Sequence, residues 1–312
     1  MRNLCIIITF IFIVGCTHSQ NRTKNTLQFA DTVRVLNDLV KITNTQKPRN
    51  YKNIITLDSV ADYIKSELIK ICDTTAFQNY KVENKTYKNV IGSIGTENKE
   101  RIIIGAHYDV YGNHTGADDN ASGVAGILEL ARLLSKEKLN YRIDFVAYTL
   151  EEPPFFRTEQ MGSAIHANYL YKNKISVKGM ICLEMIGYYN SKPNSQEYPI
   201  PGMSLIYGNK ADYITVVQHK NSGEFSDEFN QLFKSKKIIK TESLKGNSML
   251  PGVDFSDHLN YWNLNYDAVM ITNTAFYRNK NYHKKGDILS TLNLHKMSLV
   301  IEQLFLTIKT LK

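Results

Sequence analysis

The chain has 312 residues, of which 43% are hydrophobic and 22% are charged, and this is enough apolar material to bury the core of one domain. Lysine and arginine outnumber aspartate and glutamate by 38 to 30, so that the formal net charge is +8 at pH 7. The excess lies mostly in scattered lysines, and short basic runs such as residues 234–237 lack interleaved aromatic side chains. The composition therefore argues against nucleic acid as a partner and is typical of a solvated basic surface.

The N-terminal residues differ from the rest of the chain. An apolar run over residues 4–14 is too short to span a bilayer and is typical of a secretory signal. The sequence Ile-Val-Gly-Cys at 13–16 resembles the lipobox of bacterial lipoproteins, in which the cysteine is acylated. We expect residues 1–15 to be a lipoprotein signal peptide and 16–25 a polar tether, with a lipid on Cys16 holding the protein at a membrane of the bacterial cell envelope. The alternative is an ordinary signal peptide that happens to contain this cysteine.

From residue 26 onward, the spacing of apolar residues indicates alternating helices and strands. In chain order we expect helices at 26–43 and 59–72, strands at 89–94 and 101–106, a helix at 122–136, a strand at 142–149, a helix at 162–171, strands at 177–183 and 203–207, helices at 211–219 and 224–234, a strand at 268–272 and a helix at 294–311. This order predicts one α/β domain over residues 26–312. Its expected architecture is three-layer α/β/α, around a central, largely parallel mixed sheet.

Residues of the types that bind metal ions stand at the ends of several predicted strands. In chain order these are His107 and Asp109, then Asp119 at the start of a helix, then the pair Glu151 and Glu152, and then Glu184, with His283 in a later polar loop. In open α/β sheets, sites form at the carboxyl ends of the strands. Any one of these residues alone could be a solvated strand end, but three strand ends that carry acids beside a histidine indicate a shared site.

The chemistry of this set favours zinc. It contains two imidazoles and several carboxylates, which divalent zinc accepts, and it contains no thiolate, which argues against a closed structural zinc site. Five ligands suggest two ions that share one carboxylate. Only Cys72 and Cys182 remain in the body of the chain, and the sequence leaves open whether they are free thiols or a disulfide.

The order of these motifs resembles that of the family-28 metallopeptidases, a family of dizinc aminopeptidases that includes the bacterial leucyl aminopeptidases. Their shared pattern is His-x-Asp, then Asp, Glu-Glu, Asp or Glu, and a late His, and the resemblance runs from about residue 89 to the C-terminus. It implies that residues 26–312 form a zinc peptidase catalytic domain that binds two Zn²⁺ ions.

The resemblance also implies a role for each site residue. His107 and Glu184 would bind one zinc, Glu152 and His283 would bind the other, and Asp119 would bridge them; Glu151 would be the general base, Asp109 would orient His107, and Tyr282 would donate to the oxyanion. The family also carries a cis peptide after the bridging aspartate, which implies one at Asp119-Asn120.

The implied function is a zinc-dependent exopeptidase, most simply an aminopeptidase that removes N-terminal residues from peptides with a free N-terminus through a metal-activated bridging water. One alternative is an acyltransferase like the glutaminyl cyclases, which share the fold and use a single zinc. A second alternative is a non-catalytic binding lipoprotein of the same fold. The number of zinc ions per chain discriminates these three possibilities.

Several features depart from the family pattern or leave alternatives open. Glu184 stands where aspartate is commoner, and the link at 153–160 is longer than usual, so that we expect it to shape the substrate pocket. The late motif keeps His283 and Asp287 but loses a proline, which predicts a more mobile loop. The segment 256–258, Ser-Asp-His, fits either a support for the site or a helix cap by its serine.

Overall fold

The computed structural model describes residues 30–312. The expected signal peptide, the tether and Cys16 lie outside this range and remain predictions. Over residues 30–312, none of the helices combines the length and the apolar character needed to span a membrane.

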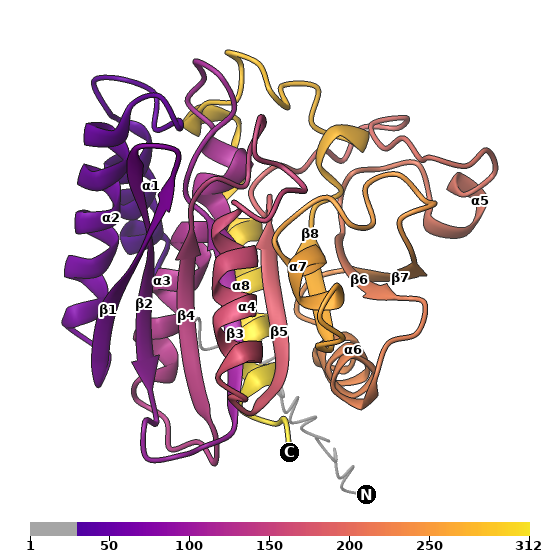
Figure 1. Ribbon diagram of the computed structural model, residues 1–312. Coiled ribbons are helices and arrows are strands. Elements are labelled where there is room, and N and C mark those ends of the chain that lie inside the picture. Colours follow the sequence, from indigo (N-terminus) through magenta and orange to yellow (C-terminus); the bar gives the residue numbers. More distant parts are fainter. Residues whose placement is uncertain (1–29) are drawn as a thin grey trace, which may run out of the picture.

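A mixed sheet of eight strands forms the centre of the protein (Figure 1). Across the sheet the strands are β1 (Thr74–Val82), β2 (Lys85–Ile94), β4 (Arg142–Tyr148), β3 (Arg101–His107), β5 (Val177–Glu184), β8 (Ala268–Thr272), β6 (Ile214–His219) and β7 (Thr241–Gly246). The four strands β4, β3, β5 and β8 are mutually parallel, and β7 is parallel to β6. The remaining pairs are antiparallel. The predicted mixed, largely parallel sheet is therefore confirmed.

Helices cover both faces of the sheet and complete the three-layer arrangement (Figure 1). Their bounds are α1 (Thr32–Thr43), α2 (Ile54–Ile69), α3 (Gly123–Leu134), α4 (Gly162–Lys172), α5 (Ser204–Tyr207), α6 (Glu224–Lys236), α7 (His258–Trp262) and α8 (Leu294–Ile308). Residues of α1, α2, α3, α6 and α8 share one hydrophobic core with one face of the sheet. Residues of α4 and α7 pack on the opposite face, in a smaller core.

The parallel centre follows from the composition of its strands. In β3, Ile102, Ile103 and Ile104 are fully buried, and they point alternately into the two cores. A strand that is apolar on both faces has to be covered on both faces, as parallel strands are in α/β proteins. The carboxyl ends of β3, β4 and β5 consequently meet beneath the same set of loops.

Two of the predicted elements are wrong. Residues 203–207 were expected to form a strand, but they contain the short helix α5, whose Leu205 and Ile206 are 90% and 76% exposed. Residues 211–219 were expected to form a helix, but Ile214–His219 is strand β6. This strand begins with the β-branched run Ile-Thr-Val-Val, and such residues favour the extended conformation. As a strand, the run packs against the helices of the larger core on one face and into the smaller core on the other.

The sequence also failed to predict strands β1 and β7. Both lie at edges of the sheet, where only one neighbour pairs with them and where most of their residues are at least partly exposed. Such strands lack the continuous apolar run that identified β3 and β5.

Candidate metal centre

Strand β3 delivers His107 to the upper end of the sheet, and Asp109 follows it in the loop. Asp109 is 1% exposed, and its Oδ1 lies 3.4 Å from Nδ1 of His107. The two oxygens of this carboxylate also accept the backbone N–H groups of Glu151 and Glu152, each at 3.2 Å. Asp109 thus contacts the imidazole and fixes the loop after β4 that carries the acidic pair.

The segment Ala117–Ser122 presents Asp118 and Asp119 in different directions. Asp118 accepts hydrogen bonds from the backbone N–H groups of Gly187 and Tyr188 and from the side-chain amides of Asn273 and Asn279. The carboxylate of Asp118 therefore joins three loops, which leaves Asp119 to face the other predicted ligands. The implied cis peptide between Asp119 and Asn120 is present.

The two oxygens of Asp119 face two separate pairs of side chains. Its Oδ1 lies 3.4 Å from Nε2 of His107, and this same nitrogen lies 3.5 Å from Oε2 of Glu184. Its Oδ2 lies 3.2 Å from Nε2 of His283, which is also 3.2 Å from Oε2 of Glu152. The five predicted ligands therefore form two groups that meet at Asp119, and in each group the candidate ligand atoms lie within 4.8 Å of one another.

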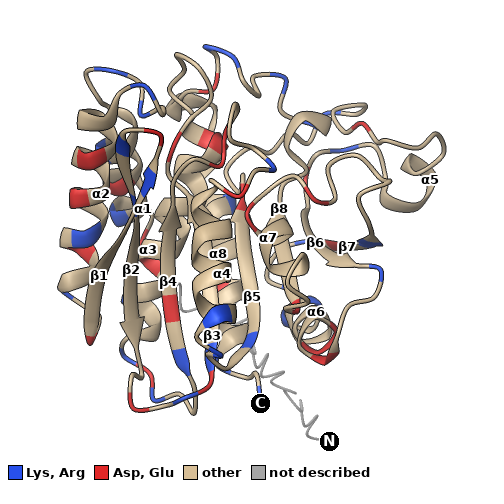
Figure 2. Ribbon diagram, viewed as in Figure 1, with Lys and Arg blue, Asp and Glu red and all other residues tan. Residues whose placement is uncertain are grey.

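Three buried atoms of this cluster have no hydrogen-bond partner among residues 30–312. They are Nδ1 of His107, Nε2 of His283 and Oε1 of Glu152. A buried polar atom without a partner is costly, whereas imidazole nitrogens and carboxylate oxygens are the donors that zinc accepts. The residues of the cluster therefore fit divalent metal ions. Acidic residues also gather near the upper ends of the central strands, whereas many lysines and arginines lie on outer helices and loops (Figure 2).

Burial and crowding shift the pKa values of the ionisable groups in this cluster. Burial raises the pKa of Glu151 well above its ordinary value, and burial together with the charge of Asp119 raises the pKa of Glu152 to about 7. Burial also raises the pKa of Glu184. Burial alone would lower the pKa of His283, but Asp119 and Glu152 outweigh it and raise that pKa to about 10. A bound cation would stabilise the charged forms of these buried carboxylates.

The ring of His283 lies between two tyrosine rings. Tyr111 stacks on it with ring centroids 4.1 Å apart, and Tyr282 stacks on it at 3.8 Å. Burial raises the pKa of the Tyr282 phenol far above its ordinary value, so that its hydroxyl stays protonated and able to donate. Asp287, the retained acid of the late motif, accepts the backbone N–H groups of Asp118 and Asp119 at 2.8 and 3.0 Å.

Ser256 supports the candidate ligand Glu184. Its hydroxyl donates to Oε2 of Glu184 at 2.7 Å, and Nδ2 of Asn120 approaches the same oxygen at 3.3 Å. The alternative of a helix cap does not hold, because α7 begins without a side-chain capping hydrogen bond. Cys182 lies 3.3 Å from the Ser256 hydroxyl, and both it and Cys72 are free thiols.

Arg49 is a residue of the site that the sequence analysis missed. This arginine is 1% exposed and donates to the backbone carbonyls of Tyr108, at 2.7 Å, of Thr115, and of Gly116, at 2.6 Å. It therefore holds the loop that connects Asp109 to Asp119. No motif surrounds Arg49, and only the folded structure brings it to this loop.

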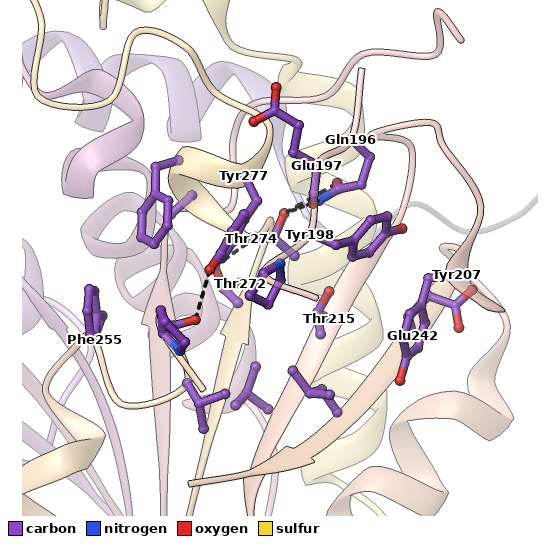
Figure 3. A pocket seen from close by; sticks show the side chains of 18 of the residues that line it. Gln196, Glu197, Tyr198, Tyr207, Thr215, Glu242, Phe255, Thr272, Thr274 and Tyr277 are labelled. Atoms are coloured by element: carbon purple, nitrogen blue, oxygen red, sulfur yellow. Dashed lines mark hydrogen bonds between the residues drawn. The ribbon is translucent and has the colours of Figure 1, made fainter. Parts of the chain in front are cut away.

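A pocket with about 770 Å³ of empty space adjoins the cluster, with Glu184 and Tyr282 in its wall (Figure 3). Its floor is formed by β8, β6 and β7, and its walls come from residues 196–207, 251–255 and 274–282. The segment 153–160 supplies none of the lining residues, so the expectation that it shapes the pocket holds only indirectly. Its Phe156 packs against Phe255, which does line the pocket, with ring centroids 5.6 Å apart.

Comparisons with known proteins identify relatives of this chain. The chain is 41% identical to a protein of Escherichia coli (strain K12) named "Uncharacterized protein YfbL", over 95% of this chain and 94% of the relative. It is 26% identical to a protein of Arthroderma otae named "Probable leucine aminopeptidase", over 85% of this chain and 68% of the relative.

Solved structures share the fold. LapB from Legionella pneumophila matches with a TM-score of 0.70 at 23% identity, over 91% of this chain and 73% of that one. The glutaminyl cyclase of Fimbriiglobus ruber matches with a TM-score of 0.68 at 18% identity, over 91% and 96%. The model of peptidase family M28 matches residues 89–307, the range that carries all the predicted site residues. The chain therefore belongs to peptidase family M28.

Proposed function

We propose that this protein is a zinc-dependent aminopeptidase that removes N-terminal residues from peptides. The observation that carries the proposal is the position of Asp119, whose two oxygens face a His–Glu pair on each side. Membership in a peptidase family and relatives named as aminopeptidases support a peptide hydrolase. The arrangement of the acids supports the more specific activity.

His107, Glu184 and Asp119 would hold one zinc ion, and Asp119, Glu152 and His283 would hold a second. When bound, the ions supply positive charge that lowers the pKa of an attacking water and polarises the scissile carbonyl. Asp109 contributes by orienting His107, because a carboxylate at the far imidazole nitrogen fixes the tautomer that binds metal.

Glu151 is the proposed general base. This residue is 6% exposed, and its carboxylate lies 3.8 Å from Nε2 of His107. Glu151 forms a third candidate group with His107 and Glu152, but it belongs to neither of the two groups that contain Asp119. It is therefore free to accept a proton from the attacking water and to return it to the leaving amine. The hydroxyl of Tyr282, which is held beside His283, is placed to donate a hydrogen bond to the developing oxyanion.

The acids of the cluster also explain a preference for a free N-terminus. An α-ammonium group that enters the site would meet the carboxylates of Glu151, Glu152 and Glu184, which are all buried. A blocked N-terminus carries no charge to pair with them. Binding of the ammonium would place the first peptide bond next to Glu151 and enforce removal of one residue at a time.

The likeness to a glutaminyl cyclase fold makes a cyclase the second candidate. A single-zinc cyclase would need one of the two groups of ligands. In this chain both groups are complete and share Asp119, and this favours two ions and hydrolysis.

The test is cleavage of a panel of peptides with free and acetylated N-termini, together with a zinc count on the same preparation. We expect about two zinc ions per chain and cleavage of the free peptides alone. Peptides with N-terminal glutamine belong in the panel. Their cyclisation, with one zinc ion per chain, would favour the cyclase, and equal cleavage of acetylated peptides would exclude an aminopeptidase.

We further propose that residues 1–15 are a lipoprotein signal peptide, that residues 16–25 tether the catalytic domain, and that a lipid on Cys16 anchors the enzyme to the bacterial cell envelope. The apolar run and the lipobox-like sequence support this proposal. Cys16→Ser should release the protein from the membrane fraction. Unchanged membrane association of this variant would contradict the anchor.

A further inference from the structure

One row of polar side chains crosses four strands from the metal centre to the edge of the sheet. Glu184 of β5 pairs with Thr272 of β8, Thr272 pairs with Thr215 of β6, and Thr215 pairs with Glu242 of β7. All four residues line the pocket. The pocket therefore begins at a candidate zinc ligand and reaches a second carboxylate on the edge strand.

The dimensions of a sheet give the length of this row. Neighbouring strands lie about 4.8 Å apart, so three steps separate the Cα atoms of Glu184 and Glu242 by roughly 14 Å. The next row along the strands is apolar and contains Met270, Val217 and Leu244, which also line the pocket. A side chain that enters from the metal centre thus passes Thr272, Thr215 and the neighbouring apolar row before it meets Glu242.

Glu242 has no ion-pair partner among residues 30–312, although lysines are close to it in sequence. Lys240 pairs with Asp212 at 3.3 Å, and Lys245 pairs with Asp227 at 2.6 Å. Tyr207 lies beside Glu242, on the side of the pocket away from Phe255 (Figure 3). Because Glu242 is partly exposed, its carboxylate is accessible to a cation that enters the pocket.

We infer that Glu242 is a specificity-determining residue, which selects peptides whose N-terminal residue is lysine or arginine. This inference rests on the proposed aminopeptidase function. The apolar stem of a lysine or arginine side chain can pack against Val217 and Leu244. Only a side chain of this length brings a cationic group to the carboxylate of Glu242. Tyrosine rings in the wall, Tyr198 and Tyr207, offer faces on which a guanidinium group stacks.

Competing side chains fit this pocket less well. Leucine or valine would contact the apolar row and stop short of Glu242, while glutamate would place its carboxylate next to that of Glu242. A neutral side chain of arginine's length would reach the edge strand without forming a charge-assisted hydrogen bond. The comparison of arginine with citrulline, its neutral analogue of similar shape, therefore isolates the contribution of Glu242.

The experiment measures kcat/KM of the full, zinc-loaded chain on fluorogenic amides of arginine, citrulline, lysine, norleucine and leucine. We expect arginine to exceed citrulline, and lysine to exceed norleucine, by about 10-fold or more. Glu242→Gln should reduce both ratios to nearly 1, because the values for arginine and lysine fall. The matched control is Glu224→Gln, because Glu224 is an exposed acid of α6, across the sheet from the pocket, and should leave both ratios intact.

Two results would overturn the inference, and they differ from each other. Cleavage of all the amides with equal values for arginine and citrulline, or ratios that survive in Glu242→Gln, would remove Glu242 as the selecting residue and leave the aminopeptidase in place. No cleavage of any amide by the zinc-loaded chain would overturn the proposed function and this inference together.

Discussion

The inner and outer strands of the sheet differ in burial and in what they carry. Six of the eight residues of β5, including Glu184, are buried, whereas β7 has no buried residue. Strands β3, β4 and β5 lead to His107, Glu152 and Glu184, and β8, β6 and the edge strand β7 form the floor of the pocket. The residues proposed for catalysis therefore stand on buried, rigid strands. The residue proposed to select the N-terminal side chain of the substrate stands on the edge strand β7, which can change in sequence without disturbing them.

The strongest test of the inner region is Glu151→Gln. The substitution keeps the shape of the side chain and removes the base, so we expect kcat to fall about a thousand-fold. The zinc content should stay at the wild-type value, because Glu151 belongs only to the third candidate group, with His107 and Glu152, and the two groups that contain Asp119 stay complete without it. Steady-state kinetics and a zinc count on the same sample check both halves of the prediction.

A matched control for this prediction is Glu100→Gln, at an exposed glutamate that lies 3.8 Å from Lys178. It should leave kcat within experimental error. Residual activity of Glu151→Gln above about a tenth of the wild type would remove Glu151 as the base.

The second test concerns how the inner region is held in place. Arg49→Met keeps an apolar stem but removes the donors to three backbone carbonyls, so we expect the free energy of unfolding in urea to fall by about 3 kcal/mol. Lys245→Met, at an ion pair whose partners are both about half exposed, should cost less than about 1 kcal/mol. Equal losses for the two variants would show that Arg49 is not a support of the loop between Asp109 and Asp119.

The contrast between the regions also explains what the sequence could predict. His107, Asp119 and Glu151 stand in short motifs next to strongly apolar strands, so local pattern and family resemblance identify them together. Arg49 and Glu242 could not be found in this way. The position of Arg49 depends on a contact with residues about 60 positions away, and that of Glu242 depends on the register of strands whose polar, exposed sequence gave no signal.

The third test uses pH and the layer between the two regions. His166 of α4 is 2% exposed and bonded to the hydroxyl of Tyr261 at 2.7 Å, and burial lowers its pKa to about 4. In the unfolded chain His166 takes up a proton near pH 6.5, whereas in the folded chain it stays neutral down to about pH 4. The contribution of His166 to the free energy of unfolding is therefore present above pH 6.5 and is lost as the pH falls towards 4. The difference in unfolding free energy between the wild type and His166→Gln should shrink by about 2–3 kcal/mol between pH 7.5 and 4.5. A constant difference would mean that His166 has the same pKa in the folded and the unfolded chain.

The smallest expected effect separates two threonines of the pocket floor. The buried hydroxyl of Thr215 has no hydrogen-bond partner among residues 30–312, whereas that of Thr272 accepts the backbone N–H of Thr274 at 3.0 Å. Replacing an unpaired hydroxyl with a methyl group removes a desolvation cost, so Thr215→Val should raise the free energy of unfolding by up to about 1 kcal/mol. Thr272→Val leaves an N–H group unpaired and should lower it by about 1 kcal/mol. Urea denaturation of both variants checks the signs, and a loss in Thr215→Val as large as that in Thr272→Val would contradict an unpaired hydroxyl at Thr215.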